Sequence, residues 1–235
     1  MRNTKKQNFY IRFLKPLIGR TVAFIGLLLL WWLYVLIAIA IVIDDPGPVL
    51  FKQRRVGKKK NGELTYFQIL KFRTMKVSTP RDVPTHLLHN PDQYITRVGR
   101  ILRKYSLDEI PQLWNIAIEG NLLWIGPRPA LYNQEDLIQE REKYGANDVM
   151  PGITGWAQVN GRDELEIEEK ARLDGVYTSD ISRGNVLAML MDLTCLIKTV
   201  KVVICSDGIN EGDNSPVRKK KRRLFFSRQR ESKKE

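Results

Sequence analysis

Residues 106–115 read Ser-Leu-Asp-Glu-Ile-Pro-Gln-Leu-Trp-Asn and place two adjacent acids, Asp108 and Glu109, at the start of an apolar helical segment. Ser106, three residues before Glu109, matches the capping box that begins many helices. Pro111 instead suits the first position of a helix that begins later. In both cases the two carboxylates lie at a helix N-terminus, where the helix dipole favours their ionised form.

The same two acids are candidates for phosphate chemistry. An ionised Asp108 is a potential nucleophile. Two carboxylates repel a phosphate unless a hard divalent cation bridges the carboxylate and phosphate oxygens. Arginines hold phosphate oxygens in bidentate fashion, and the candidates on either side of the pair are Arg103, Arg128 and Arg162. A short motif is weak evidence, so the residues alone favour a helix cap over catalysis.

The 235-residue chain carries a net charge of +13, and this charge is unevenly distributed. Residues 1–60 carry +10 and residues 217–235 carry +8, whereas residues 61–216 carry −5. Basic ends beside an apolar segment suit anionic membrane lipid. The sequence has no zinc-finger pattern and no aromatic-rich RNA-binding strand, so no nucleic acid partner is predicted. The two cysteines, Cys195 and Cys205, are not spaced for a metal site or a disulfide framework, as expected in a reducing compartment.

The apolar segment is residues 22–43, which contain no charged side chain. As a helix it would be about 33 Å long, enough to cross the hydrocarbon core of a bilayer. Basic clusters flank it on both sides, and the positive-inside tendency favours a re-entrant helix that keeps both clusters on the cytoplasmic face. Its length favours a span, and no proline interrupts it to make a turn easy. Both topologies stay open, and we favour the re-entrant one.

The rest of the sequence predicts an α+β fold: a single membrane-associated domain with a small β-hairpin and amphipathic helices at the membrane surface. We expect a membrane helix segment at 1–45, a cytosolic catalytic domain at 46–210 and a polybasic, disordered tail at 211–235. For the amphipathic helix at 187–204, core packing is favoured over a position in the membrane interface. The other elements expected are strands at 49–53 and 64–75 around a basic turn at 56–62, helices at 94–105, 134–144 and 165–176, a short apolar run at 122–125, and an ordered glycine-rich loop at 151–162.

Several motifs occur in a fixed order along the chain. Besides residues 106–115 they are Gly-Pro-Val-Leu-Phe-Lys-Gln-x-Arg-Val-Gly (47–57), Lys-Phe-Arg-Thr-Met (71–75), Gly-Pro-Arg-Pro (126–129) and Pro-Gly-Ile-Thr-Gly-Trp-Ala-Gln-Val-Asn-Gly-Arg (151–162). Together they resemble the bacterial sugar transferase family, the monotopic polyprenyl-phosphate phosphoglycosyltransferases, in what looks like a minimal catalytic form. A set of motifs in family order is far more specific than any single motif.

This resemblance implies an activity and a location. Such enzymes transfer sugar-1-phosphate from a UDP-sugar to undecaprenyl phosphate and release UMP, on the cytoplasmic face of the bacterial inner membrane. The product starts a capsule, exopolysaccharide or other glycoconjugate. No motif here specifies the sugar or the oligomeric state.

The resemblance also implies residue roles. Asp108 corresponds to the nucleophile that forms a phosphosugar-aspartyl intermediate, Glu109 completes the acidic pair, and both would organise the expected cofactor, Mg²⁺. Arg103 and Arg128 fall where phosphates are held. Proximity to substrate is implied for Gln158, Asn160 and Arg162.

Two positions depart from the family pattern. Trp32-Leu33 stand where many relatives have a Ser-Pro pair that aids the re-entrant bend, and Asn121 stands where the family often has Asp. Two other functions are compatible with the sequence. One is a non-catalytic membrane-surface scaffold, and the other is a hydrolase of the same phosphosugar bond.

Overall fold

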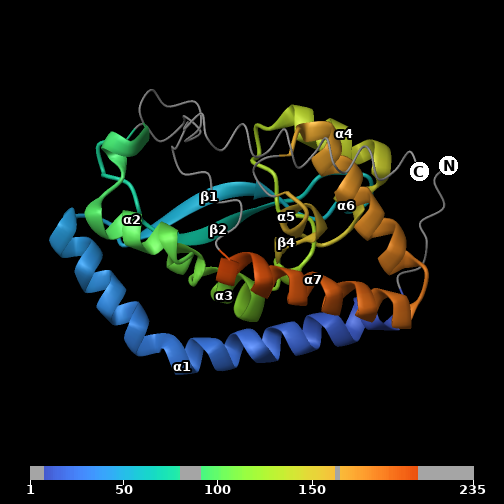
Figure 1. Ribbon diagram of the computed structural model, residues 1–235, viewed down its shortest axis with the longest axis horizontal. Coiled ribbons are helices and arrows are strands. Elements are labelled where there is room, and N and C mark those ends of the chain that lie inside the picture. The colour runs from blue at the N-terminus through green and yellow to red at the C-terminus, as the bar shows by residue number, and fades with distance from the viewer. Residues whose placement is uncertain (1–7, 80–90, 162–164, 206–235) are drawn as a thin grey trace.

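The computed structural model describes residues 8–79, 91–161 and 165–205. As predicted, the fold combines helices with small sheets, and a long N-terminal helix runs beneath the body (Figure 1). The strands are β1 (Leu50–Val56), β2 (Tyr66–Phe72), β3 (Leu123–Ile125) and β4 (Gly152–Thr154). The helices are η1 (Tyr10–Leu14), α1 (Lys15–Asp44), η3 (Pro91–Tyr94), α2 (Arg97–Lys104), η4 (Leu107–Glu109), α3 (Gln112–Trp114), η5 (Asn115–Glu119), α4 (Glu135–Tyr144), η6 (Ala146–Asp148), α5 (Trp156–Val159), α6 (Ile167–Ser182) and α7 (Asn185–Cys205).

Helix η1 continues directly into α1, and in the described part of the chain only this helix, Tyr10–Asp44, is long and apolar enough to cross a membrane. Small residues on its inner side allow the body to approach closely. At Gly19 an added Cβ would lie 3.2 Å from Trp124 Cδ1, and the indole Nε1 of Trp124 donates to the Gly19 carbonyl at 2.9 Å. Ala23 is fully buried against the same region. Large apolar side chains occupy the outward face of α1 and are exposed, among them Leu28, Leu29, Trp31, Trp32 and Ile43.

Helix α1 bends in its middle, so that its C-terminal part rises towards α2 (Figure 1). The hydroxyl of Tyr34 donates to the carbonyl of Ile110 at 2.7 Å on the inner side of this C-terminal half. Beyond it, Ile37 and Ile41 are buried in a cluster with Phe72 and Leu102. The bend has no proline, so packing of the second half against α2 and β2 holds it instead of a local break in the backbone.

The predicted hairpin is confirmed: β1 and β2 pair antiparallel from Leu50 opposite Phe72 to Val56 opposite Tyr66. Asn115 fastens this hairpin to the helical segment that follows the acidic pair. Its Oδ1 accepts from Leu70 N at 3.0 Å, and its Nδ2 donates to the Gln68 carbonyl at 2.8 Å. Because Asn115 is fully buried, these hydrogen bonds set how β2 lies relative to α3.

The expected loop at 151–162 contains two short elements instead, and this is a correction. Strand β4 pairs in parallel with β3, and α5 follows at once. Two of the three glycines in this segment are required by backbone approach: a Cβ on Gly152 would lie 2.2 Å from Gly126 N, and one on Gly155 would lie 2.1 Å from Gly126 O. The pairing partner lies about thirty residues upstream, so local composition did not reveal the strand.

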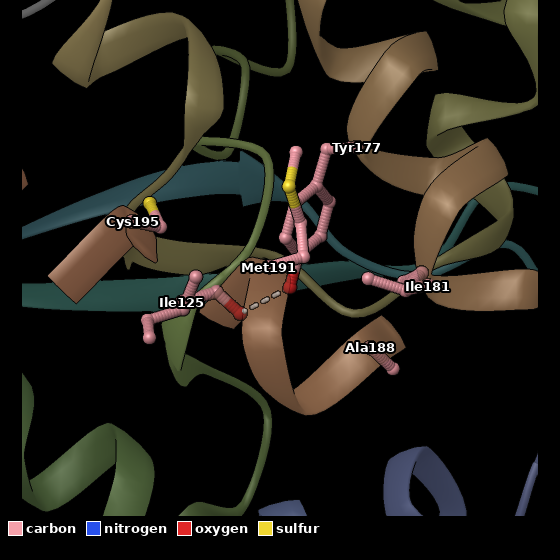
Figure 2. Close-up of a cluster of buried hydrophobic side chains, with 6 residues drawn as sticks. All are labelled: Ile125, Tyr177, Ile181, Ala188, Met191 and Cys195. Atoms are coloured by element: carbon pink, nitrogen blue, oxygen red, sulfur yellow. Dashed lines mark hydrogen bonds between the residues drawn. The ribbon is translucent and has the colours of Figure 1, made fainter. Parts of the chain in front are cut away.

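Helices α4, α6 and α7 complete the body. The inner face of α7 supplies Ala188, Met191 and Cys195 to a buried cluster with Tyr177 of α6 (Figure 2). Core packing of α7 is therefore confirmed for this face. The opposite face is also apolar and exposed, and it carries Val186, Met189, Leu190, Leu193, Leu196, Ile197 and Val200.

A buried polar network joins α1 to α6 and α7. The Lys15 ammonium donates to Asp192 Oδ1 at 2.9 Å and also contacts the Tyr177 hydroxyl. Tyr177 and Tyr10 donate their hydroxyls to Asp192 Oδ1 and Oδ2, at 2.7 and 2.9 Å. Because Lys15, Tyr177 and Asp192 are buried and satisfy one another, the N-terminal end of α1 is fixed to α6 and α7.

Candidate active site

The two acids lie in the tight 3₁₀ turn η4, and the backbone before it is unusual. Ser106 adopts a left-handed conformation with φ of 54°, and its side chain makes no capping hydrogen bond within the described part of the chain. The carboxylate of Glu109 points to other partners, so the capping-box interpretation is wrong. Pro111 occupies the N-cap of α3 and not its first helical position. Helix α3 spans only three residues before η5 continues it, so the acids precede a short turn instead of a long helix.

Glu109 is held by two cations. Its Oε1 accepts from Lys71 Nζ at 2.9 Å and is also contacted by Arg128 Nη2, while Arg128 Nη1 lies 3.5 Å from Oε2. Burial by itself would raise the pKa of Glu109, but the charges and hydrogen bonds of Arg128 and Lys71 outweigh burial and lower the pKa well below its ordinary range. Glu109 is therefore firmly ionised at neutral pH.

Asp108 has a different environment. Its side chain is 13% exposed and lies 3.6 Å from Lys71 Nζ, too far for a hydrogen bond. Burial raises the pKa of Asp108, and the positive charges of Lys71, Arg103 and Arg128 only partly offset this effect. The expectation that a helix N-terminus would favour its ionised form is wrong. The site thus moves the pKa values of two adjacent carboxylates apart, a pattern typical of acids with different roles.

Of the three arginines predicted around the pair, Arg103 and Arg128 lie among the described residues, and both are close to it. Arg128 Nη1 donates to the Ile153 carbonyl at 3.0 Å, which orients the guanidinium towards Glu109. Arg103 Nε donates to Thr74 Oγ1 at 2.9 Å, and the charge of Arg103 lowers the pKa of Asp108. Strand β2, helix α2 and the turn after β3 therefore place their cations around one acidic pair.

Gln158 and Asn160 lie on or just after α5. Asn160 donates to the Trp156 carbonyl at 2.7 Å and accepts from Lys198 at 3.2 Å, so its hydrogen bonds do not involve the acids. Gln158 Oε1 is buried and finds no hydrogen-bond partner among the residues described. The link from this segment to the acids is the carbonyl of Ile153, which Arg128 contacts. Arg162 lies outside the described residues.

Sequence reasoning gave no role to two further cations, Lys71 and Arg55. Lys71 lies in β2 between Leu70 and Phe72 and contacts both acids. Arg55 lies in β1, and its charge interacts with Glu109 and Arg128. A charged residue inside an apolar strand was the available signal for Lys71. Its target became evident only from the packing of β2 against η4.

The acidic pair also bears on the expected metal. Across residues 8–79, 91–161 and 165–205, no group of three or more His, Cys, Asp or Glu side chains converges as a metal cage. Mg²⁺ is usually held by one or two carboxylates together with substrate phosphates and water. Asp108 and Glu109 supply such a pair, so the residues present fit an ion shared with a phosphate substrate.

Comparison of the sequence with known proteins identifies relatives of this chain. The profile of the bacterial sugar transferase family matches residues 10–206. The chain is 40% identical to "Uncharacterized sugar transferase EpsL" of Bacillus subtilis over 179 residues, covering 75% of this chain and 81% of that protein. It is 32% identical to "Exopolysaccharide production protein ExoY" of Rhizobium meliloti, covering 79% and 83% of the two chains.

A third relative is longer. The chain is 39% identical to "UDP-glucose:undecaprenyl-phosphate glucose-1-phosphate transferase" of Xanthomonas campestris, with 66% of this chain matched but only 31% of that protein. The matched part holds about a third of the longer relative. The coverage by the family profile and the identities to EpsL and ExoY nevertheless lead to one conclusion: this chain belongs to the bacterial sugar transferase family.

Proposed function

We propose that this protein transfers sugar-1-phosphate from a UDP-sugar to undecaprenyl phosphate, releases UMP, and so begins synthesis of an exopolysaccharide, capsule or other glycoconjugate. The observation that carries the proposal is the geometry of the acidic pair: Asp108 lies 3.6 Å from Lys71 Nζ, and Lys71 and Arg128 both bind the adjacent Glu109. The names of the Xanthomonas and Rhizobium relatives support the substrates and the pathway class.

The reaction proceeds in two displacements at phosphorus. An oxygen of ionised Asp108 attacks the phosphorus that bears the sugar, and the bond to the UMP oxygen breaks, so UMP leaves with the electron pair. A phosphate oxygen of undecaprenyl phosphate then attacks the same phosphorus, which restores the Asp108 carboxylate. Burial, which raises the pKa of Asp108, also makes its ionised form more basic and more nucleophilic.

The neighbouring cations orient the acidic pair and balance the negative charge of the carboxylates and phosphates. Lys71 and Arg128 hold Glu109. Arg103 and Arg128 would bind phosphate oxygens. Asp108 and Glu109 would hold Mg²⁺ together with the substrate, and the ion supplies neutralisation of phosphate charge when bound.

The exposed apolar surfaces support association of the protein with the membrane. The outward faces of α1 and α7 are both apolar, and α7 lies on the side of the body that faces α1 (Figure 1). Both ends of α1 contact the body, through Lys15 at one end and through Asp44, whose Oδ2 accepts from Val98 N at 2.8 Å, at the other. A re-entrant α1 on the cytoplasmic face accounts for these contacts. The polybasic tail predicted at 211–235 lies outside the described residues.

One assay tests the proposed activity. The purified protein is incubated with undecaprenyl phosphate, Mg²⁺ and a panel of UDP-sugars, and UMP is measured. We expect UMP from at least one sugar, no UMP from Asp108→Asn, and normal UMP from the matched control Asp92→Asn, which alters an exposed acid. A scaffold would release no UMP with any sugar, and a hydrolase would continue to release UMP without the lipid acceptor.

The covalent step has its own test. When the β-phosphate of the UDP-sugar is labelled and the acceptor is omitted, the label should remain on the protein in a one-to-one ratio and map to residues 106–115. The Asp108→Asn protein should stay unlabelled. Label that never attaches to the wild-type protein under these conditions, although UMP forms when acceptor is added, would contradict a covalent intermediate.

Topology is tested by labelling. A cysteine introduced at Asn3 should resist an impermeant thiol reagent in intact cells and react in inverted vesicles. Reaction from outside would show that α1 spans the membrane.

A further inference from the structure

Arg55 is a partly buried cation next to the active site that the proposed chemistry does not use. Its neighbour Arg54 is exposed on the other face of β1 and lies over the rings of Tyr66 and Tyr132. Arg55 turns inward, because successive side chains of a strand alternate between faces. Its Nη1 donates to the Pro129 carbonyl at 3.0 Å, and its Nη2 donates to Gln53 Oε1 at 2.6 Å.

These contacts reach the segment that immediately follows Arg128. The backbone of Arg55 forms a bridge with Leu131, and Val56 N donates to the Ala130 carbonyl at 3.0 Å. The end of β1 and the guanidinium of Arg55 therefore hold three consecutive residues after Arg128. The backbone on the other side of Arg128 is held too, since Gly126 N donates to the Thr154 carbonyl at 2.8 Å.

The charge of Arg55 also acts on the site. Burial lowers the pKa of Arg55 to about 10, the charge of Arg128 lowers it, and that of Glu109 raises it, so Arg55 remains a cation at neutral pH. Like charges on Arg55 and Arg128 repel, and Glu109 attracts both. Within the described residues the Nε of Arg55 is buried without a hydrogen-bond partner. The hydrogen bonds from its two Nη atoms therefore fix the position of this side chain.

We propose that Arg55 is a positioning residue for the transferase: it holds the Pro129 carbonyl and thereby keeps Arg128 on Glu109. This inference rests on the proposed function for its kinetic consequence, although its structural consequence can be measured without any activity. The ion pair of Arg128 with Glu109 is exposed on one side, since the Arg128 side chain is 33% exposed. A fixed backbone lowers the entropy cost of holding a partly exposed guanidinium in one orientation, and so adds to the hydrogen bond that Arg128 makes with the Ile153 carbonyl.

The variants are Arg55→Met, which removes the charge and the donors, and Arg55→Lys, which keeps the charge but not the two-pronged geometry. The matched control is Arg54→Met on the opposite face of the same strand. Hydrogen–deuterium exchange of peptides covering 126–131 is measured first. We expect faster exchange there in both Arg55 variants and unchanged exchange in Arg54→Met. Unchanged exchange in the Arg55 variants would overturn the inference, even if the protein proved to have another activity.

The kinetic test is a double-mutant cycle with Arg128→Ala, in which the rate of UMP release is measured. Arg55→Met alone should lower kcat/KM for the UDP-sugar about ten- to a hundredfold, because a charged hydrogen bond orients the residue that binds phosphate. In the Arg128→Ala background the same substitution should cost less than about twofold, since its target is gone. Equal losses in both backgrounds would show that Arg55 acts independently of Arg128. If Arg55→Met does not fold, Arg55→Lys completes the cycle with the same criterion.

Discussion

The two adjacent acids should respond in opposite ways to the same isosteric change. Glu109→Gln removes the anion between Lys71 and Arg128, whose side chains are 19% and 33% exposed. The two partly buried cations then keep only Asp108 of the acidic pair, which lies 3.6 Å from Lys71 Nζ. Breaking a fully buried pair costs about 3–5 kcal/mol and an exposed pair at most about 1 kcal/mol. For this intermediate burial we expect a loss of about 2–3 kcal/mol, which lowers Tm by roughly 4–12 °C in a domain of this size.

Asp108→Asn should leave Tm unchanged or raise it. The pKa of Asp108 is raised in the folded protein, so the folded state binds its proton more tightly than the unfolded chain does. Ionisation of Asp108 at neutral pH therefore reduces stability, and asparagine removes that cost. Glu109 has the opposite sign: its pKa is lowered, so its stabilisation is present at neutral pH and disappears only as the pH falls through its low folded value.

The assay is thermal unfolding in detergent at pH 7.5, with a chelator and without substrate, for the wild type, both variants and Asp92→Asn. Both acid variants should be inactive, so activity alone does not separate them, whereas Tm does. Equal losses of Tm, or a larger loss in Asp108→Asn than in Glu109→Gln, would refute the reasoning from burial and ion pairing.

Four further outcomes are expected. Lys71→Met should lower kcat/KM in the UMP assay by about ten- to a hundredfold, because a charged donor to the acidic pair is lost. The apparent pKa on the acid side of the pH profile of kcat/KM should lie above the ordinary Asp range, since burial raises the pKa of Asp108 and protonation removes the nucleophile. An apparent pKa at or below that range would contradict this expectation. Gly99→Ala should lower both Tm and activity, because its Cβ would lie 2.1 Å from the Thr74 carbonyl and push α2 away from the site, at a cost of about 1–3 kcal/mol. Asp174→Asn should destabilise by about 3–5 kcal/mol in denaturant unfolding, because it leaves a buried arginine unpaired, while kcat of the folded fraction stays unchanged.

Features with a local signal were predictable from the sequence. The hairpin followed from two strand-like segments around a basic turn. The apolar run at 22–43 predicted a helix and placed its C-terminal end correctly, but α1 begins earlier, at Lys15. The acidic pair and its two arginines were identified by motif order, and the structure brings Arg103 and Arg128 close to the pair. The roles of these residues remain predictions.

Features that depend on distant partners were not predictable. Strand β4 exists because β3 lies beside it, and Lys71 reaches the acids only because Asn115 docks β2 on the next segment. The left-handed backbone at Ser106 also escaped prediction, since the same residues fit a helix cap. The pKa of Asp108 followed burial, which depends on the whole fold, and not the local helix dipole.

The network around Lys15 has a consequence for biogenesis. Lys15 and Asp192 are separated by 177 residues, so at roughly 5–20 residues per second the ribosome needs about 10–35 s to deliver the second after the first. During that interval Lys15 and the apolar helix have been synthesised, but Asp192, the partner of Lys15, has not. The ammonium must stay in water or among lipid headgroups until then, because burying it unpaired is costly. Helix α1 is therefore secured by α7, which is synthesised much later, and a nascent chain arrested before α7 carries an apolar helix whose N-terminal end is not yet docked.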